Sequence, residues 1–118
     1  MAKRRKKPDA AYVNAVAEMG GRCFRCGRTA AQKPAWWHAP FLIERSHIVN
    51  KPRREDRRAV IPLCSFCHRV QHGDRFDGFK HLEPLSMERL LEFKRFYDPD
   101  YFDLEWLQRH SVRRLPEI

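Results

Sequence analysis

Apolar residues recur at helical or alternating intervals along most of the chain, and these intervals predict its elements. Residues 8–19 have helical spacing, and Gly20-Gly21 can end the helix that they predict. Residues 29–40 contain two prolines and two adjacent tryptophans, which favours irregular structure. The β-branched and aromatic residues within 41–49 predict a strand.

The next segments predict a hairpin followed by a helix. Residues 50–58 are polar and basic, so we expect a loop there. Residues 59–63 favour a short return strand, and Pro62 confines this strand to a sheet edge or lies at its end. A helix is expected over about 65–72, and Gly73 can end it.

The C-terminal third predicts two further helices. Ser86 suits the N-cap of a helix over about 87–97, in which apolar residues recur at helical spacing. A last helix is expected over about 100–109. The aromatic side chains of this region are expected to form core rather than a ligand site. They are Phe93, Phe96, Tyr97, Tyr101, Phe102 and Trp106.

Length and composition indicate one domain. The chain has 118 residues, which is too short for two ordinary domains. Of these residues 42% are hydrophobic and 33% are charged, an ordinary mixture for a folded domain. No stretch approaches the roughly 18 apolar residues of a membrane span, and the basic N-terminus lacks the apolar centre of a secretory signal. We therefore expect a cytoplasmic protein without a membrane partner, with a basic arm over 1–8 and one domain over 9–118.

The net charge of +9 favours a polyanionic partner, with nucleic acid first. Residues 1–72 hold 16 basic and 5 acidic side chains, whereas residues 73–118 hold 8 and 10. A solubility tail with a solvated face is the alternative interpretation. The candidate DNA-binding residues lie in the arm and in the predicted loop: Lys3, Arg4, Arg5, Lys6, Lys7, Lys51, Arg53, Arg54, Arg57 and Arg58.

All four cysteines occur in two Cys-x-x-Cys pairs, Cys23 with Cys26 and Cys64 with Cys67. This spacing lets both thiolates of a pair bind one tetrahedral ion, which predicts a structural Zn²⁺ site. Two disulfides or buried free thiols are the alternatives. The 37 residues between the pairs exceed what a simple zinc ribbon needs, so we expect functional residues in this insertion.

Three of the six histidines are placed to converge. His68 and His72 are four residues apart on a predicted helix, so their side chains share a face and can bind one ion. His47 lies on the predicted first strand, which the hairpin would bring beside that helix. A lone histidine on a strand is usually structural, but three convergent histidines indicate a metal-dependent site.

This combined pattern resembles the ββα-metal motif of HNH endonucleases, most closely the compact zinc-braced members common in phages. The resemblance is carried by Glu44-Arg45-Ser46-His47-Ile48, Leu63-Cys64-Ser65-Phe66-Cys67-His68 and His72, and it covers about residues 23–73. It implies an α+β fold with a His-Me finger core over about 41–73 and a C-terminal helical extension over about 84–110.

The resemblance also implies a role for each matching residue. His47 matches the general base that activates water, and His68 and His72 match ligands of a catalytic divalent cation. The structural zinc ligands match Cys23, Cys26, Cys64 and Cys67.

Two positions depart from the family pattern. Ser46 stands where the family usually has an Asp or His metal ligand, and it is the third candidate ligand of the catalytic cation. Ala59 stands where the family has an asparagine that orients the general base. Glu44 and Asn50 are candidate supporting residues, and Asn50 or a backbone carbonyl would have to orient His47.

The expected function is metal-dependent DNA endonuclease activity with low sequence specificity, by nicking or double-strand cleavage. Imidazole ligands favour Mn²⁺, Ni²⁺, Co²⁺ or Zn²⁺ over Mg²⁺ as the catalytic cation. Expected partners are DNA and either a second copy of the chain or, for a phage-encoded protein, packaging proteins such as terminase. A catalytically impaired zinc-dependent DNA-binding module and a protein-interaction domain are the alternative functions.

Overall fold

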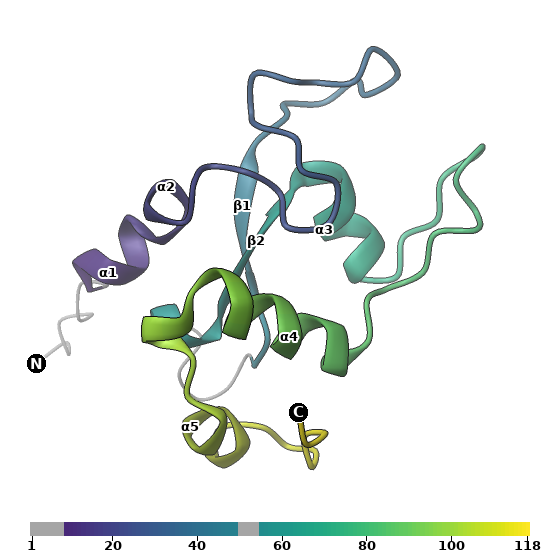
Figure 1. Ribbon diagram of the computed structural model, residues 1–118. Coiled ribbons are helices and arrows are strands. Elements are labelled where there is room, and N and C mark those ends of the chain that lie inside the picture. Colours follow the sequence, from purple (N-terminus) through teal and green to yellow (C-terminus); the bar gives the residue numbers. More distant parts are fainter. Residues whose placement is uncertain (1–8, 50–54) are drawn as a thin grey trace, which may run out of the picture.

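The computed structural model describes residues 9–49 and 55–118 and has an α+β architecture (Figure 1). The N-terminal half holds two short helices and the first strand. These are α1 (Ala10–Val13), α2 (Ala15–Glu18) and β1 (Ile43–His47). The rest of the described chain adds one strand, three helices and two 3₁₀ turns. These are η1 (Arg57–Ala59), β2 (Val60–Cys64), α3 (Ser65–Gln71), α4 (Met87–Tyr97), η2 (Pro99–Tyr101) and α5 (Leu104–Arg109).

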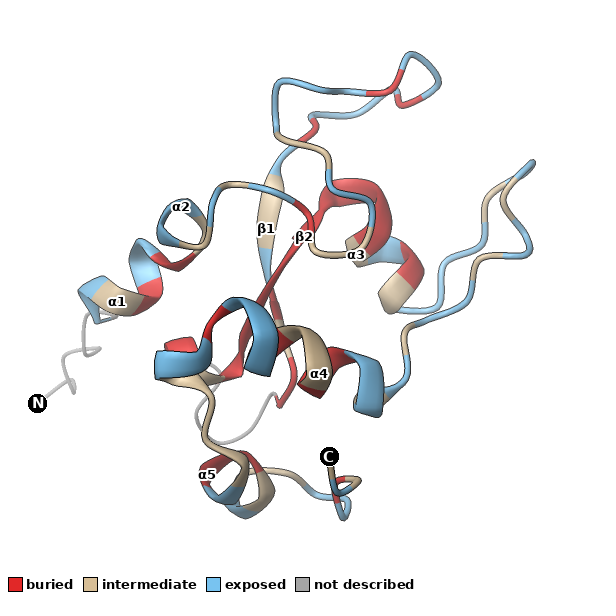
Figure 2. Cartoon of the chain, in the orientation of Figure 1, coloured by how far each residue is buried: buried red, intermediate tan, exposed pale blue. Residues whose placement is uncertain are grey.

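A two-stranded antiparallel hairpin lies at the centre of the fold. β1 pairs with β2 in a register that places Ile43 opposite Cys64 and His47 opposite Val60. β2 is buried along its whole length, whereas β1 is only partly covered (Figure 2). α3 begins directly after β2, because the sulfur of Cys64 accepts the backbone N–H of Cys67 and caps the helix.

Helices cover both strands of the hairpin. α2 contacts β1 and β2, α3 contacts both strands, and α4 packs on β2. The main core joins side chains of β2 and α3 to those of α4 and α5, with Leu63, Val70, Leu91 and Leu107 all almost fully buried. The hairpin and α3 therefore form a fixed base for the side chains that project from them.

Most predicted elements are confirmed, with shorter bounds. The N-terminal helix is interrupted at Asn14, which caps α1 and precedes α2. Residues 29–40 contain no helix or strand, as expected. α4 spans the predicted residues, and the Ser86 hydroxyl accepts the N–H of Arg89. The predicted last helix is divided into η2 and α5.

The expectation that the C-terminal aromatic side chains form core is wrong at two positions. The side chains of Phe96 and Tyr97 are 77% and 52% exposed, while Trp106 is buried. α4 turns Leu90, Leu91 and Lys94 towards the core instead, and Phe96 lies on the opposite side of the helix. Apolar spacing alone did not distinguish these two faces, because a lysine occupies the central buried position.

Among residues 9–49 and 55–118, no helix has the length and apolar character needed to cross a membrane.

Candidate metal centre and histidine site

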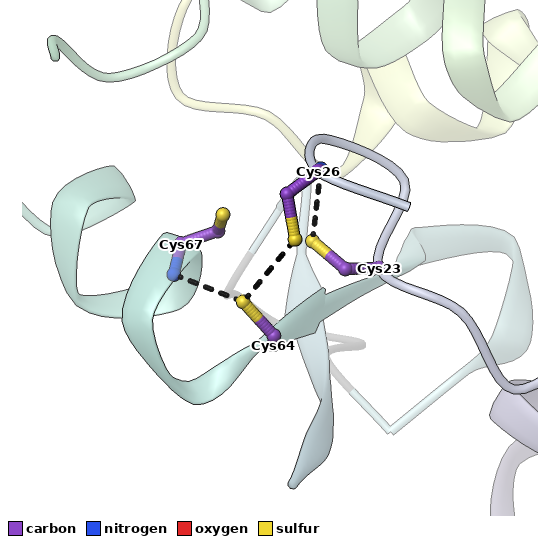
Figure 3. Close-up of side chains that lie close together, drawn as sticks. All are labelled: Cys23, Cys26, Cys64 and Cys67. Atoms are coloured by element: carbon purple, nitrogen blue, oxygen red, sulfur yellow. Dashed lines mark hydrogen bonds between the residues drawn. The ribbon is translucent and has the colours of Figure 1, made fainter. Parts of the chain in front are cut away.

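The four cysteines come together where β2 meets α3. Cys23 and Cys26 lie on the loop after α2, and Cys64 and Cys67 lie at the end of β2 and in α3 (Figure 3). All four sulfurs lie within 4.8 Å of one another, and those of Cys26 and Cys64 are 3.8 Å apart. Cys23, Cys64 and Cys67 are buried, and Cys26 reaches the surface.

This geometry fits a tetrahedral ion. A Zn–S bond of about 2.3 Å places two sulfurs of a tetrahedron about 3.8 Å apart, whereas a disulfide needs about 2.0 Å. Two backbone N–H groups also point at ligand sulfurs, from Cys26 to Cys23 and from Cys67 to Cys64. The cysteines are therefore positioned to hold a metal ion, in agreement with the predicted structural zinc site.

The protonation of the thiols depends on their crowding. Hydrogen bonds from the thiols of Cys64 and Cys67 hold the pKa of Cys23 far below its usual value. The same contacts raise the pKa of Cys64 to about 12, and they raise that of Cys67 as well. Crowding of the thiols therefore shifts the pKa of Cys23 down and those of Cys64 and Cys67 up.

A second polar cluster joins β1 to α3. The Nδ1–H of His68 donates to the carboxylate of Glu44 at 2.9 Å, which leaves the lone pair on Nε2. The Nε2 atoms of His68 and His72 are 3.0 Å apart. This is a hydrogen-bond distance. Two nitrogens bound to one ion at about 2.0–2.1 Å each would be about 2.9–3.4 Å apart, depending on the angle at the metal, so a small shift would also let the pair hold a shared cation.

The carboxylate of Glu44 is in contact with the ring of His68. A histidine that binds a metal usually donates its other ring N–H to a carboxylate or carbonyl, which orients the ring. Glu44 and His68 show this arrangement across the strand–helix junction. The expected support from Glu44 is therefore directed at His68, and sequence spacing gave no indication of which histidine it would reach.

His47 lies at the end of β1, on the face opposite Glu44, because side chains alternate along a strand. Of the three histidines expected to converge, the described residues bring together His68 and His72, and no group of three ligand atoms includes His47. Its Nε2 is 3.0 Å from the hydroxyl of Tyr12 in α1, and the two rings stack with centroids 5.9 Å apart. Sequence analysis missed Tyr12 because 35 positions separate the two residues. The one indirect signal in the sequence is Ala59, which cannot orient His47 as the asparagine of the family pattern would and so implies another partner.

The two departures from the family pattern are both buried. The side chain of Ser46 is 5% exposed and that of Ala59 is 0% exposed. A buried neutral hydroxyl is poorly placed to bind a hydrated cation, so Ser46 is not supported as a ligand. Ala59 packs in the core, and its carbonyl accepts the N–H of Ile48 across the hairpin.

Arg57 was expected to bind DNA, but its side chain is only 8% exposed and belongs to the core. Its guanidinium donates to Asp98 at 2.9 and 3.2 Å and to Glu18 at 3.0 and 3.2 Å, and it stacks on Tyr101. Lys94 donates to Asp98 and to the carbonyl of Arg57, both at 2.6 Å. All three guanidinium nitrogens of Arg57 therefore donate to groups within the fold.

Arg58 is partly engaged as well. It donates to Asp56 at 2.9 and 3.0 Å and lies 4.1 Å above the ring of Trp106. Its side chain remains 34% exposed, so it can still meet a phosphate at the surface. The other predicted DNA-binding residues and Asn50 lie outside the described residues: Lys3, Arg4, Arg5, Lys6, Lys7, Lys51, Arg53 and Arg54.

Within the described ranges, the cysteine cluster is the one group of three or more histidine, cysteine or acidic residues whose ligand atoms all lie within 4.8 Å. The histidine site brings two ring nitrogens together, one each from His68 and His72. No family model, curated protein or solved structure matches the chain.

Proposed function

We propose that this chain is a metal-dependent DNA endonuclease of the HNH type, with His47 as general base and one divalent cation bound by His68 and His72. The observation that carries the proposal is the pair of Nε2 atoms 3.0 Å apart, with Glu44 behind His68. His68 lies in the helix that follows the hairpin and His72 is the C-cap of that helix, while His47 ends the first strand of the hairpin.

The two imidazoles and the carboxylate define which ions suit the site. Imidazole nitrogen favours Mn²⁺, Co²⁺, Ni²⁺ or Zn²⁺ over Mg²⁺, which prefers oxygen ligands. Such an ion would supply positive charge to the phosphate and the leaving oxygen. His68 and His72 would hold it, and Glu44 would fix the ring of His68 so that Nε2 faces the ion.

The reaction of this chain's own residues is phosphodiester hydrolysis. His47 accepts a proton from water while the water oxygen bonds to phosphorus, and the bond from phosphorus to the 3′ oxygen breaks. The products are a 5′-phosphate and a 3′-hydroxyl, the latter formed when solvent protonates the leaving oxygen. The excess of basic residues supports binding to the DNA backbone without reading of the sequence.

Cleavage of a supercoiled plasmid tests this function. Purified protein is assayed with Mn²⁺, Ni²⁺, Co²⁺ and Mg²⁺ in parallel, and we expect nicked or linear products with less activity in Mg²⁺. His47→Ala should lower the rate by roughly 10²–10⁴-fold, which is the usual contribution of a general base. His68→Ala should weaken the dependence on the added ion.

The matched control is His81→Ala, since His81 is exposed and lies outside the histidine site. It should cleave like the unaltered protein. Cleavage that persists unchanged in His47→Ala would exclude the proposed mechanism and point to a contaminating nuclease.

A second candidate function is a zinc-dependent DNA-binding module without catalysis. Burial of Ser46 favours it, because the usual third protein ligand of the catalytic ion is then missing. Gel-shift binding of the same DNA, with no cleavage in any of the four ions, would select this function over the nuclease.

A further inference from the structure

The hydroxyl of Tyr12 meets the ring nitrogen Nε2 of His47, although the two residues come from α1 and β1. We propose that Tyr12 is the positioning residue of His47: its hydroxyl oxygen accepts the Nε2–H and thereby holds the imidazole with its lone pair on Nδ1. This role rests on the proposed function, in which His47 accepts a proton from water.

The position of the Tyr12 hydroxyl is fixed by its surroundings. Tyr12 is buried and packs with Ala15 and Val60 in a small cluster separate from the main core. The guanidinium of Arg45 lies 4.6 Å above its ring and donates to the carbonyl of Val13 at 3.2 Å. A ring held on both sides presents its hydroxyl at one place, which is what orienting another side chain requires.

The hairpin offers no side chain for this task at the position where the family pattern has one. Ala59 is completely buried and carries no polar side-chain atom. Tyr12 approaches instead from α1, and its ring lies nearly parallel to that of His47, at 22°. The stacked ring and the hydroxyl together restrict both the tilt and the rotation of the imidazole.

The direction of this hydrogen bond decides which nitrogen can act as base. A neutral imidazole has one N–H and one lone pair, so donation of Nε2–H to Tyr12 leaves Nδ1 as the acceptor. Donation in the opposite sense, from the hydroxyl to Nε2, would place the ring proton on Nδ1. The proposal therefore predicts the Nε2–H tautomer.

The test compares Tyr12→Phe with the unaltered full-length protein. This variant keeps the ring and its packing but removes the hydroxyl, and the matched control is Tyr97→Phe, whose side chain is half exposed and packs on Phe24. With a short DNA duplex, we expect kcat to fall by about 10–100-fold with KM unchanged, because a mispositioned catalytic group loses rate rather than binding. Tyr97→Phe should retain both constants.

A second readout does not depend on activity. ¹⁵N NMR of the unaltered protein at neutral pH should show His47 protonated on Nε2, with that proton protected from solvent exchange. In Tyr12→Phe the same proton should exchange rapidly, while metal content and melting temperature stay the same. A merely structural tyrosine would lower the melting temperature without this local change.

The outcomes separate the two proposals. If His47→Ala is inactive but Tyr12→Phe cleaves with the original kcat, the nuclease stands and the role of Tyr12 is overturned. A His47 protonated on Nδ1 in the unaltered protein also overturns it. If His47→Ala keeps full activity, the proposed function fails, even where NMR shows the Nε2–H bond to Tyr12.

Discussion

The cysteine cluster and the ionic cluster formed by Glu18, Arg57, Lys94 and Asp98 both tie the N-terminal segment to the rest of the fold, but they are built oppositely. The cysteine cluster gathers four groups that become anions when they bind a metal. The ionic cluster pairs two cations with two anions through hydrogen bonds of 2.6–3.2 Å. One cluster needs an external cation, and the other supplies its own counterions.

The comparison shows two ways to stabilise a domain of this size. Crowded thiols gain their stability from the ion, because crowding raises the pKa of Cys64 and Cys67 and so opposes their thiolate forms until a cation is bound. The ionic cluster depends on complete pairing, because a buried charge without a partner carries a large desolvation penalty. Removing the metal should therefore disrupt the first cluster, and removing a single partner should disrupt the second.

Removal of the metal should have the largest effect. Structural zinc contributes roughly 10–16 kcal/mol in small zinc domains, which matches or exceeds the whole stability of an ordinary domain, about 5–15 kcal/mol. We expect one tightly bound zinc per chain by metal analysis and loss of the cooperative melting transition after chelation. Added zinc should restore the transition, and a metal-free protein with unchanged melting would show that the cysteines stabilise the fold without an ion.

Asp98→Asn should have the next largest effect. The variant leaves the guanidinium of Arg57 and the ammonium of Lys94 facing a neutral amide in a buried site, where loss of one partner typically destabilises by about 3–5 kcal/mol. Denaturant unfolding, monitored by tryptophan fluorescence in the presence of zinc, measures this change.

The matched comparison is Lys94→Met, which removes a completely buried lysine but leaves Asp98 paired with Arg57. Burial lowers the pKa of Lys94, although the hydrogen bond to Asp98 offsets part of this effect. Because the variant removes a buried charge that is held at the expense of hydration, its destabilisation should be smaller than that of Asp98→Asn. An equal or larger loss would show that Lys94, rather than the pairing of Asp98, is the centre of the cluster.

The pH dependence of zinc binding should be a smaller effect than the two above, and steeper than that of a site whose thiols are already ionised. The pKa of Cys64 is raised to about 12 and that of Cys67 is raised as well, so zinc must displace at least these two protons. Each displaced proton makes the affinity tenfold weaker per unit of falling pH, or about 100-fold for two. Competition with a chromophoric chelator between pH 6 and 8 measures this slope, and a slope of zero would mean that the thiols are already ionised.

The cysteine cluster could be predicted from the sequence, whereas the ionic cluster could not. The Cys-x-x-Cys pairs predicted the cysteine cluster because their short spacing constrains two ligands at a time. His68 and His72 were predicted to share a face for the same reason, and their Nε2 atoms do converge. The ionic cluster has no such signature, since its members are 39 and 41 positions apart for the two pairs made by Arg57.

The errors have a related physical cause. Arg57 was expected to contact DNA because it lies in a basic stretch, and Phe96 was expected in the core because it follows apolar spacing. The fold buries the arginine because its partners arrive from α2 and from the end of α4. It exposes the phenylalanine because α4 turns Leu90, Leu91 and Lys94 towards the core instead. A charged side chain becomes a core residue when distant segments satisfy all its hydrogen bonds.

The sequence by itself determined the local features of this protein: its helices and hairpin, the two cysteine pairs, and the shared face of His68 and His72. These depend on residues a few positions apart, whose relative geometry the backbone constrains. Only the tertiary structure decided that Glu44 orients His68, that Tyr12 meets His47 and that Arg57 is buried. Each of these contacts joins separate elements, and the packing of those elements sets which polar groups become partners.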